Sequence, residues 1–339
     1  MKKILSLALV FIVVLSSFWV YATENENEEC VKSMVVVGDF LSTGYGLVTE
    51  RESEANESEK ISYADAAAKK LGLVKDETYF NYSKNETASA DLLAYLCGEL
   101  SEKELESFKG ADAVVVTVGM NDLVGAILPK ISIALGLEES ASPADVSNAL
   151  AKIEEKNLEN ALNELKTIYE KGKADFDALT VSYGENISAS VKKINELSPN
   201  AQVFVVNVYD PFSDLSQYAL VKTLRATLTT KIASEMNEKL TEAAKNEGFY
   251  IVDADTEFKG RKKACISADS EYFCLTELGH SILSDTLVYR VATVYDEIYD
   301  SVNGIFSDPE DIWIWFTFAV AIVVIAIPIV SFVAKKSKR

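Results

Sequence analysis

Short apolar runs, rich in β-branched and aromatic residues, alternate with longer stretches of helical pattern along most of this chain. We expect strands at 34–37, 78–82, 113–118, 203–208 and 249–252. We expect helices between and after them, at 63–71, 88–100, 143–197, 213–246 and 276–302. Short apolar strands, each followed by a helix, are typical of a parallel sheet with both faces covered. The sequence therefore predicts an α/β fold with a parallel sheet.

The segment 143–197 is long for a single connection and is rich in Lys, Glu, Ala and Leu. Its period fits an amphipathic helical hairpin packed on the sheet, with an interruption near Tyr183-Gly184. Because the alternation of strands and helices resumes directly afterwards, we expect a helical insertion within one domain that covers residues 23–302. A second small domain is the alternative.

The first 22 residues have the features of an export signal. Two lysines follow the first methionine, an apolar stretch continues to Val20, and Ala22 precedes a polar run. A basic start, a short apolar core and a small residue before polar sequence are typical of a secretory signal peptide. We therefore expect 1–22 to be a signal peptide, with an uncleaved N-terminal anchor as the alternative.

A second apolar segment, 312–334, runs for 23 residues without a charge, and four cations follow it in 335–339. About 20 apolar residues span a bilayer. Trp313 and Trp315 at one end and the basic cluster at the other fit an aromatic belt and the positive-inside rule. We expect a short linker at 303–311, one transmembrane helix at 312–334 and a cytoplasmic tail. The protein would then be a single-pass protein of the cell membrane with an extracytoplasmic N-terminal domain.

The chain is strongly acidic, with 52 acidic against 33 basic side chains and a net charge of −19. Six of the basic residues lie at its two ends, so the part between them is more acidic still. Such a charge repels nucleic acid and anionic headgroups. We therefore expect no nucleic-acid partner.

Four cysteines, Cys30, Cys97, Cys265 and Cys274, fall in the part expected to be exported. An even number in an oxidising compartment permits two disulfides in three connectivities. Cys265 and Cys274 would close a short loop, and we expect them to be bonded. Their spacings fit no zinc pattern and the chain has one histidine, so we expect no metal site and no cofactor.

Three short blocks follow predicted strands. Gly38-Asp39-Phe40 follows the first strand and leads into a small-polar turn, and Gly119-Met120-Asn121-Asp122 follows the third. Between them, a polar loop with Glu86 at its centre precedes a predicted helix. A fourth block, Glu271 to His280, precedes the last helix.

These four blocks, in this order, resemble the SGNH or GDSL-type hydrolases, a family of esterases, lipases and deacylases. The resemblance covers about residues 33–302 and implies a flavodoxin-like three-layer fold. It places Phe40 at the nucleophile position, Glu86 at an oxyanion-hole glycine and Asn121 at the side-chain oxyanion donor. It places Cys274 at the catalytic histidine and Glu271 at the acid that orients it.

These substitutions remove the chemistry that the family implies. A phenyl ring cannot attack a carbonyl, and a carboxylate at position 86 opposes the charge that an oxyanion hole stabilises. Cysteine does not provide the paired proton transfer of an imidazole near neutral pH. In another alignment, Glu277 and His280 are the acid and base and Ser42 is the nucleophile.

Two main functions follow from these alignments. The first is a catalytically degenerate, membrane-anchored domain that binds or scaffolds an extracellular ligand, a glycan or a protein. The second is an active serine esterase, lipase or deacylase that uses His280 on extracellular ester or acyl-sugar groups. A structural surface protein without a retained pocket is a third reading.

Overall fold

The computed structural model describes residues 31–47, 61–98, 100–151, 158–211, 229–267 and 273–307. The expected signal peptide, transmembrane helix and cytoplasmic tail lie outside these residues. Within them, no helix combines the length and apolar character needed to cross a bilayer. The chain divides into two compact units, residues 1–289 and 290–339, and the sheet belongs to the first.

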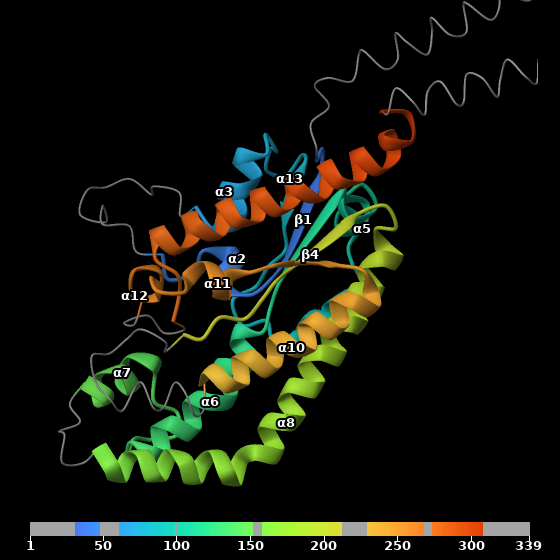
Figure 1. The fold of residues 1–339 in the computed structure, drawn as a ribbon. Coiled ribbons are helices and arrows are strands. Elements are labelled where there is room, and N and C mark those ends of the chain that lie inside the picture. Colours follow the sequence, from blue (N-terminus) through green and yellow to red (C-terminus); the bar gives the residue numbers. More distant parts are fainter. Residues whose placement is uncertain are drawn as a thin grey trace, which may run out of the picture. The chain divides into compact units, whose positions relative to one another are not determined.

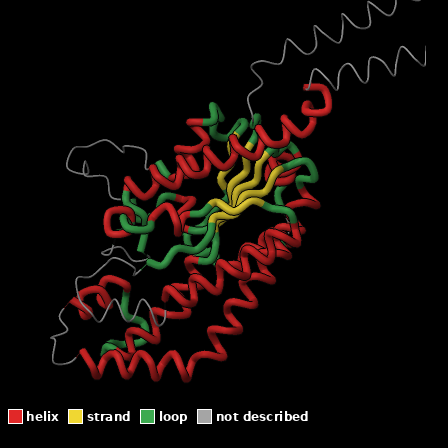
Figure 2. Tube along the Cα trace, viewed as in Figure 1, coloured by secondary structure: helices red, strands yellow, loops and turns green. Residues whose placement is uncertain are grey.

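A parallel sheet of five strands lies at the centre of the first unit, in the order β2-β1-β3-β4-β5 (Figures 1 and 2). The strands are β1 (Met34–Gly38), β2 (Tyr79–Asn81), β3 (Ala113–Thr117), β4 (Gln202–Val206) and β5 (Tyr250–Val252). Each lies at a predicted strand, and the order is that of flavodoxin-like doubly wound folds. The predicted α/β fold with a parallel sheet is confirmed.

The central strands are buried on both faces. Every residue of β1 and of β3 is buried, and the two strands pair in register from Met34 opposite Ala113 to Gly38 opposite Thr117. This burial explains why these runs are continuously apolar rather than alternating. Their carboxyl ends therefore reach the same edge of the sheet.

Helices cover both faces of the sheet, with α3 and the first part of α13 on one face and α8 and α10 on the other (Figure 1). The helices before the insertion are α2 (Phe40–Thr43), α3 (Tyr63–Lys70), α4 (Ser89–Cys97), α5 (Glu102–Lys109) and α6 (Met120–Ala134). Those after it are α10 (Thr230–Glu247), α11 (Ala254–Phe258), α12 (Lys262–Cys265) and α13 (Glu277–Ser307). A capping box of Ser62 and Asp65 begins α3, as the Ser-x-x-Asp pattern favours.

The insertion contains α7 (Pro143–Ala151) and α8 (Leu158–Leu197). The interruption expected near Tyr183-Gly184 is wrong, because α8 runs through both residues. A Cβ atom on Gly184 would lie 2.9 Å from Cβ of Lys239. This glycine therefore allows α8 to approach α10 closely instead of ending the helix.

The last helix is longer than expected. The sequence predicts a linker at 303–311, whereas α13 continues to Ser307. The apolar pattern fades near Val302, but hydrogen bonding along the helix continues past that point. The remainder of the expected linker lies outside the described residues.

Candidate functional site

Two glycines shape the carboxyl ends of β1 and β3. Gly38 has φ +155°, and a Cβ atom there would lie 2.1 Å from the carbonyl oxygen of Thr117. Gly119 has φ +118°, and its Cβ atom would lie 2.6 Å from Cγ2 of Val208. Side chains are excluded at both positions, so the Gly-Asp and Gly-Met-Asn-Asp blocks can turn tightly beside each other.

Phe40 is the first residue of the short helix α2. Asp39 caps this helix by accepting a 3.0 Å hydrogen bond from the main-chain N–H of Leu41. The Phe40 side chain is 1% exposed. The position where the family resemblance expects a nucleophile is therefore occupied by a buried ring.

Asp39 lies beneath this turn and is fully buried. Its Oδ2 atom has no hydrogen-bond partner within the described chain. Burial raises the pKa of Asp39 well above its usual range, the Leu41 N–H opposes this, and the nearby Asp122 adds to it. A raised pKa favours the neutral acid, which costs less to bury than a carboxylate.

The loop after β2, which contains Glu86, is joined to the loop after β1. Oγ1 of Thr43 donates a 2.6 Å hydrogen bond to Oδ1 of Asn85, and the N–H of Lys84 donates a 2.9 Å bond to the carbonyl of Gly38. Glu86 itself is exposed. Its carboxylate therefore lies at the surface of this edge of the sheet.

Asn121 faces the same loop. Its side-chain Nδ2 donates to the carbonyl oxygens of Asn85 at 2.8 Å and of Thr87 at 3.0 Å. An amide nitrogen has two hydrogens, so both are used by the main chain on either side of Glu86. The structure thus brings Asn121 and the Glu86 loop together, but with the amide directed at the protein itself.

Asp122 holds the start of α4. It accepts hydrogen bonds from the N–H of Ser89 at 2.9 Å and from Oγ of Ser89 at 2.6 Å. Burial raises the pKa of Asp122, and both bonds from Ser89 oppose this shift. Asp122 therefore positions the helix that follows the Glu86 loop.

Cys274 is fully buried, and Glu271 lies outside the described residues. The expected Cys265–Cys274 disulfide is wrong, because these thiols are not joined. The N–H of Ser267 donates to the carbonyl of Cys274, and that of Thr276 to the carbonyl of Cys265, both at 2.8 Å. In this antiparallel register the two cysteines are diagonal neighbours. Diagonal Cα atoms are about 7–8 Å apart, beyond the usual disulfide span of about 4.4–6.8 Å.

The residues of the second alignment lie in different surroundings. Glu277 is exposed, whereas Ser42 and His280 are buried. Oγ of Ser42 shares a 3.1 Å hydrogen bond with the hydroxyl of Tyr63. Nδ1 of His280 accepts a 3.0 Å bond from the N–H of Tyr63, and its Nε2 has no hydrogen-bond partner within the described chain. Ser42 and His280 therefore contact opposite ends of one tyrosine rather than each other.

Burial lowers the pKa of His280 to about 4. A neutral ring that accepts at Nδ1 must carry its proton on Nε2, and this N–H faces no acceptor in the described residues. The ring also stacks on Tyr63, with centroids 6.4 Å apart. The arrangement is that of a histidine held neutral in a core.

Tyr63 is the residue that sequence reasoning missed. Its hydroxyl contacts both Ser42 and Thr117, and burial raises the pKa of its phenol. It thereby connects α2, β3 and the start of α13. The one signal available was its place directly after Ser62 at a helix start, which says nothing about these distant contacts.

Residues 34–287 match the family model described as GDSL-like lipase/acylhydrolase. No curated protein sequence matches the chain. An extracellular lipase from Streptomyces rimosus is 20% identical with a TM-score of 0.51, and the match covers 76% of this chain and 99% of that chain. A lipase from a goat rumen metagenome is also 20% identical, with a TM-score of 0.49 and coverage of 76% and 96%. The Streptomyces structure shows a shared fold, and the family match, which spans well over half of the sequence, shows that the chain belongs to the GDSL-like lipase/acylhydrolase family.

Proposed function

We propose that this protein is an exported, single-span membrane protein whose GDSL-type domain has lost hydrolytic chemistry and acts by binding. The observation with most weight is Phe40 at the nucleophile position, buried to 1% exposure. A buried hydrocarbon ring has neither a lone pair nor an ionisable proton with which to attack an ester.

The oxyanion site gives independent support. Asn121 directs both amide hydrogens at the carbonyls of Asn85 and Thr87, so neither is directed at a bound substrate oxygen. Oxyanion stabilisation depends on donors already aimed at the position where charge develops. In this domain the Asn121-Asp122 block makes contacts within the fold, and the Asn121 amide is not available to stabilise an oxyanion.

The base position gives a third line of support. Cys274 is buried, and the one histidine is held neutral with Nδ1 occupied by Tyr63. General base catalysis requires a group within hydrogen-bond reach of the proton that it removes. Nδ1 of His280 accepts from Tyr63 and its Nε2 has no partner among the described residues, so His280 makes no hydrogen bond to Ser42.

The proposed location follows from the two ends of the sequence. The expected signal peptide at 1–22 and transmembrane helix at 312–334 would place the acidic domain outside the cell and the basic tail inside. A tethered domain of this kind would bind a ligand, glycan or protein at the cell surface.

An active esterase is the second candidate. Its support is that Ser42 and His280 both bond to Tyr63. Because they contact opposite ends of that residue, a rearrangement is needed to bring the Ser42 hydroxyl within reach of the imidazole. The substrate would be an extracellular ester or acyl-sugar group.

Hydrolysis of p-nitrophenyl acetate and p-nitrophenyl butyrate by the full chain in detergent distinguishes the candidates. We expect the rate of a buffer blank. Ser42→Ala and His280→Ala are the test variants, and Ser182→Ala, at an exposed serine on α8, is the matched control. Turnover by the wild type that Ser42→Ala or His280→Ala abolishes, but Ser182→Ala does not, would establish the esterase instead.

A further inference from the structure

A polar cleft of about 620 Å³ opens at the carboxyl ends of β4 and β5, in the first unit. It is distinct from the family site, since Phe40, Glu86, Asn121 and Cys274 are not among the residues that line it. Open α/β sheets bind ligands at the carboxyl ends of their strands, and ligand sites usually have volumes of about 300–1,000 Å³. The cleft therefore has the position and the size of a small-molecule site.

One wall of the cleft is a face of α10. Thr230, Ser234, Asn237 and Thr241 all line it, and their spacing of four, three and four residues places them on one side of the helix. Hydroxyl and amide groups both donate and accept hydrogen bonds. Thr230 and Thr241 already donate their hydroxyl hydrogens, to Asp210 and to the carbonyl of Asn237, so they offer acceptor lone pairs to a ligand. Ser234 and the second amide hydrogen of Asn237 can donate. The wall therefore suits a ligand whose own groups both donate and accept.

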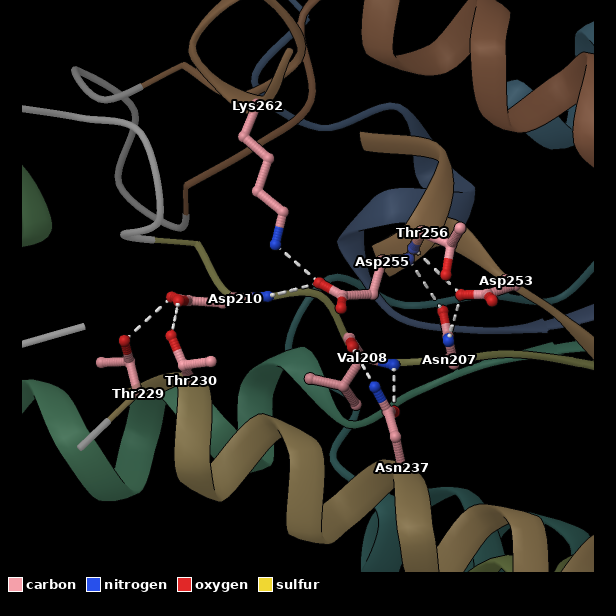
Figure 3. Close-up of polar contacts among 10 residues, drawn as sticks. All are labelled: Asn207, Val208, Asp210, Thr229, Thr230, Asn237, Asp253, Asp255, Thr256 and Lys262. Atoms are coloured by element: carbon pink, nitrogen blue, oxygen red, sulfur yellow. Dashed lines mark hydrogen bonds and ion pairs between the residues drawn. The ribbon is translucent and has the colours of Figure 1, made fainter. Parts of the chain in front are cut away.

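The opposite wall presents charges of both signs (Figure 3). Nζ of Lys262, a residue that is 6% exposed, lies 2.6 Å from Oδ1 of Asp255. Asp253 accepts through Oδ1 from Nδ2 of Asn207 at 2.7 Å. In the described part of the chain these bonds reach only Oδ1, so the Oδ2 atoms of both carboxylates remain as acceptors for a ligand.

The lining is held in place by its own hydrogen bonds (Figure 3). Asn237 donates to the carbonyl of Val208 at 2.7 Å and accepts from its N–H at 3.0 Å. Asp210 accepts from the hydroxyls of Thr229 at 2.9 Å and Thr230 at 2.6 Å. Side chains fixed before binding lose little entropy when a ligand arrives.

We propose that this cleft binds a saccharide. The ion pair of Lys262 with Asp255 cancels much of the local charge, which disfavours a strongly charged ligand. The neutral wall of α10 and the open carboxylate oxygens together match vicinal hydroxyl groups, which donate to carboxylates and accept from hydroxyl and amide groups. This proposal rests on the binding role proposed above, to which it gives a location.

To test the proposal, sugars are titrated into the full chain in detergent, and their binding is detected by saturation-transfer NMR. The probes are glucose, mannose, galactose, N-acetylglucosamine and cellobiose. The detergent is of the polyoxyethylene type, because a maltoside headgroup would compete. We expect saturable binding of at least one probe, weakened at least tenfold by Ser234→Leu/Thr241→Leu, which fills the cleft from two exposed positions of α10.

The matched control is Ser182→Leu/Thr167→Leu, which changes the same residue types at exposed positions of α8. It is expected to bind like the wild type, and thermal melts verify that both variants are folded.

Absence of saturable binding for all five sugars, or equal affinity in the two double variants, would overturn the proposal. Spermidine binding that is sensitive to the α10 variant, without any sugar binding, would assign the cleft to cations and also overturn it. The ester assay reports on catalysis separately, so failure of the proposed function is distinguishable from failure here.

Discussion

The main-chain N–H of Tyr63 donates a 3.0 Å hydrogen bond to Nδ1 of His280. The bond joins the start of α3 to the start of α13, which are more than 200 residues apart in sequence. It requires an unprotonated Nδ1 atom. Protonation of the ring would place two N–H groups against each other and leave an imidazolium buried.

His280 is therefore expected to make the protein less stable in acid. Its pKa is about 4 in the folded protein and about 6.5 in an unfolded chain. Because the unfolded state binds the proton more readily, stability is lost as the pH falls from 6.5 to 4. The loss amounts to about 3 kcal/mol at most.

His280→Asn tests this expectation, because Oδ1 of asparagine can accept from the Tyr63 N–H and does not titrate. Urea unfolding at pH 6.5, 5 and 4 should give a smaller decrease in the free energy of unfolding for the variant than for the wild type. All other titrating groups are shared, so the difference isolates His280. Parallel curves for the two proteins would contradict the prediction.

Asp39 is expected to act in the opposite direction. Its folded pKa lies well above the usual range because it is buried, whereas the unfolded value is about 3.9. Its stabilising effect is thus fully present below about pH 4 and is lost as the pH rises toward the folded pKa. Asp39→Asn keeps an Oδ1 acceptor for Leu41 and remains neutral.

The free energy of unfolding of Asp39→Asn, relative to the wild type, should therefore increase between pH 4 and pH 7. Urea unfolding at pH 4, 5.5 and 7 measures it. Asp76→Asn is the control, since Asp76 is exposed and has φ +62°, a conformation that asparagine tolerates. A relative stability of Asp39→Asn that is constant with pH would show that Asp39 is not the buried acid described here.

Gly38→Ala should destabilise the protein more than Gly248→Ala. Both glycines have positive φ, at which a non-glycine residue costs about 1–3 kcal/mol. Only at Gly38 does the added Cβ also meet a main-chain atom, at 2.1 Å from the Thr117 oxygen, whereas Gly248 has open space. Urea unfolding of the two variants measures the difference, and equal losses would mean that β1 and β3 can separate at little cost.

The sheet was predictable because its strands are visible as short apolar runs, most clearly β1 and β3, in which every residue is buried. All five strands were located from such runs, and β1 and β3 lack polar residues almost entirely. The contacts of the site were not predictable in the same way. The bond from Tyr63 to His280 joins residues 217 positions apart, and no local pattern encodes that partner.

The errors have similar physical causes. Cys265 and Cys274 are close in sequence, but the register of their two segments makes them diagonal rather than facing. Gly184 is a poor helix former, yet its lack of a side chain is what lets α8 pack against α10. In both cases the tertiary structure determines the outcome, whereas the spacing of residues or their helix propensity alone predicts a different one.

Restoring the family residues provides the last prediction. Phe40→Ser alone should not hydrolyse p-nitrophenyl acetate, because a serine hydroxyl without a base remains protonated. Cys274→His supplies a base at the predicted histidine position. Glu86→Gly removes a carboxylate from the predicted oxyanion site, where one donor is worth about 3 kcal/mol in the transition state. Since groups that act as a unit are strongly non-additive, only the triple variant is expected to turn over the ester.

The matched control is Phe40→Ala/Glu86→Gly/Cys274→His, which has the same loop and base but no nucleophile. Truncating a buried phenylalanine costs about 3–5 kcal/mol, so thermal melts must first show that both triple variants are folded. Because Asn121 bonds to the main chain on both sides of position 86, glycine there is also expected to loosen the loop and release its amide. Hydrolysis by Phe40→Ser alone, or equal hydrolysis by the two triple variants, would show that these positions are not the family site.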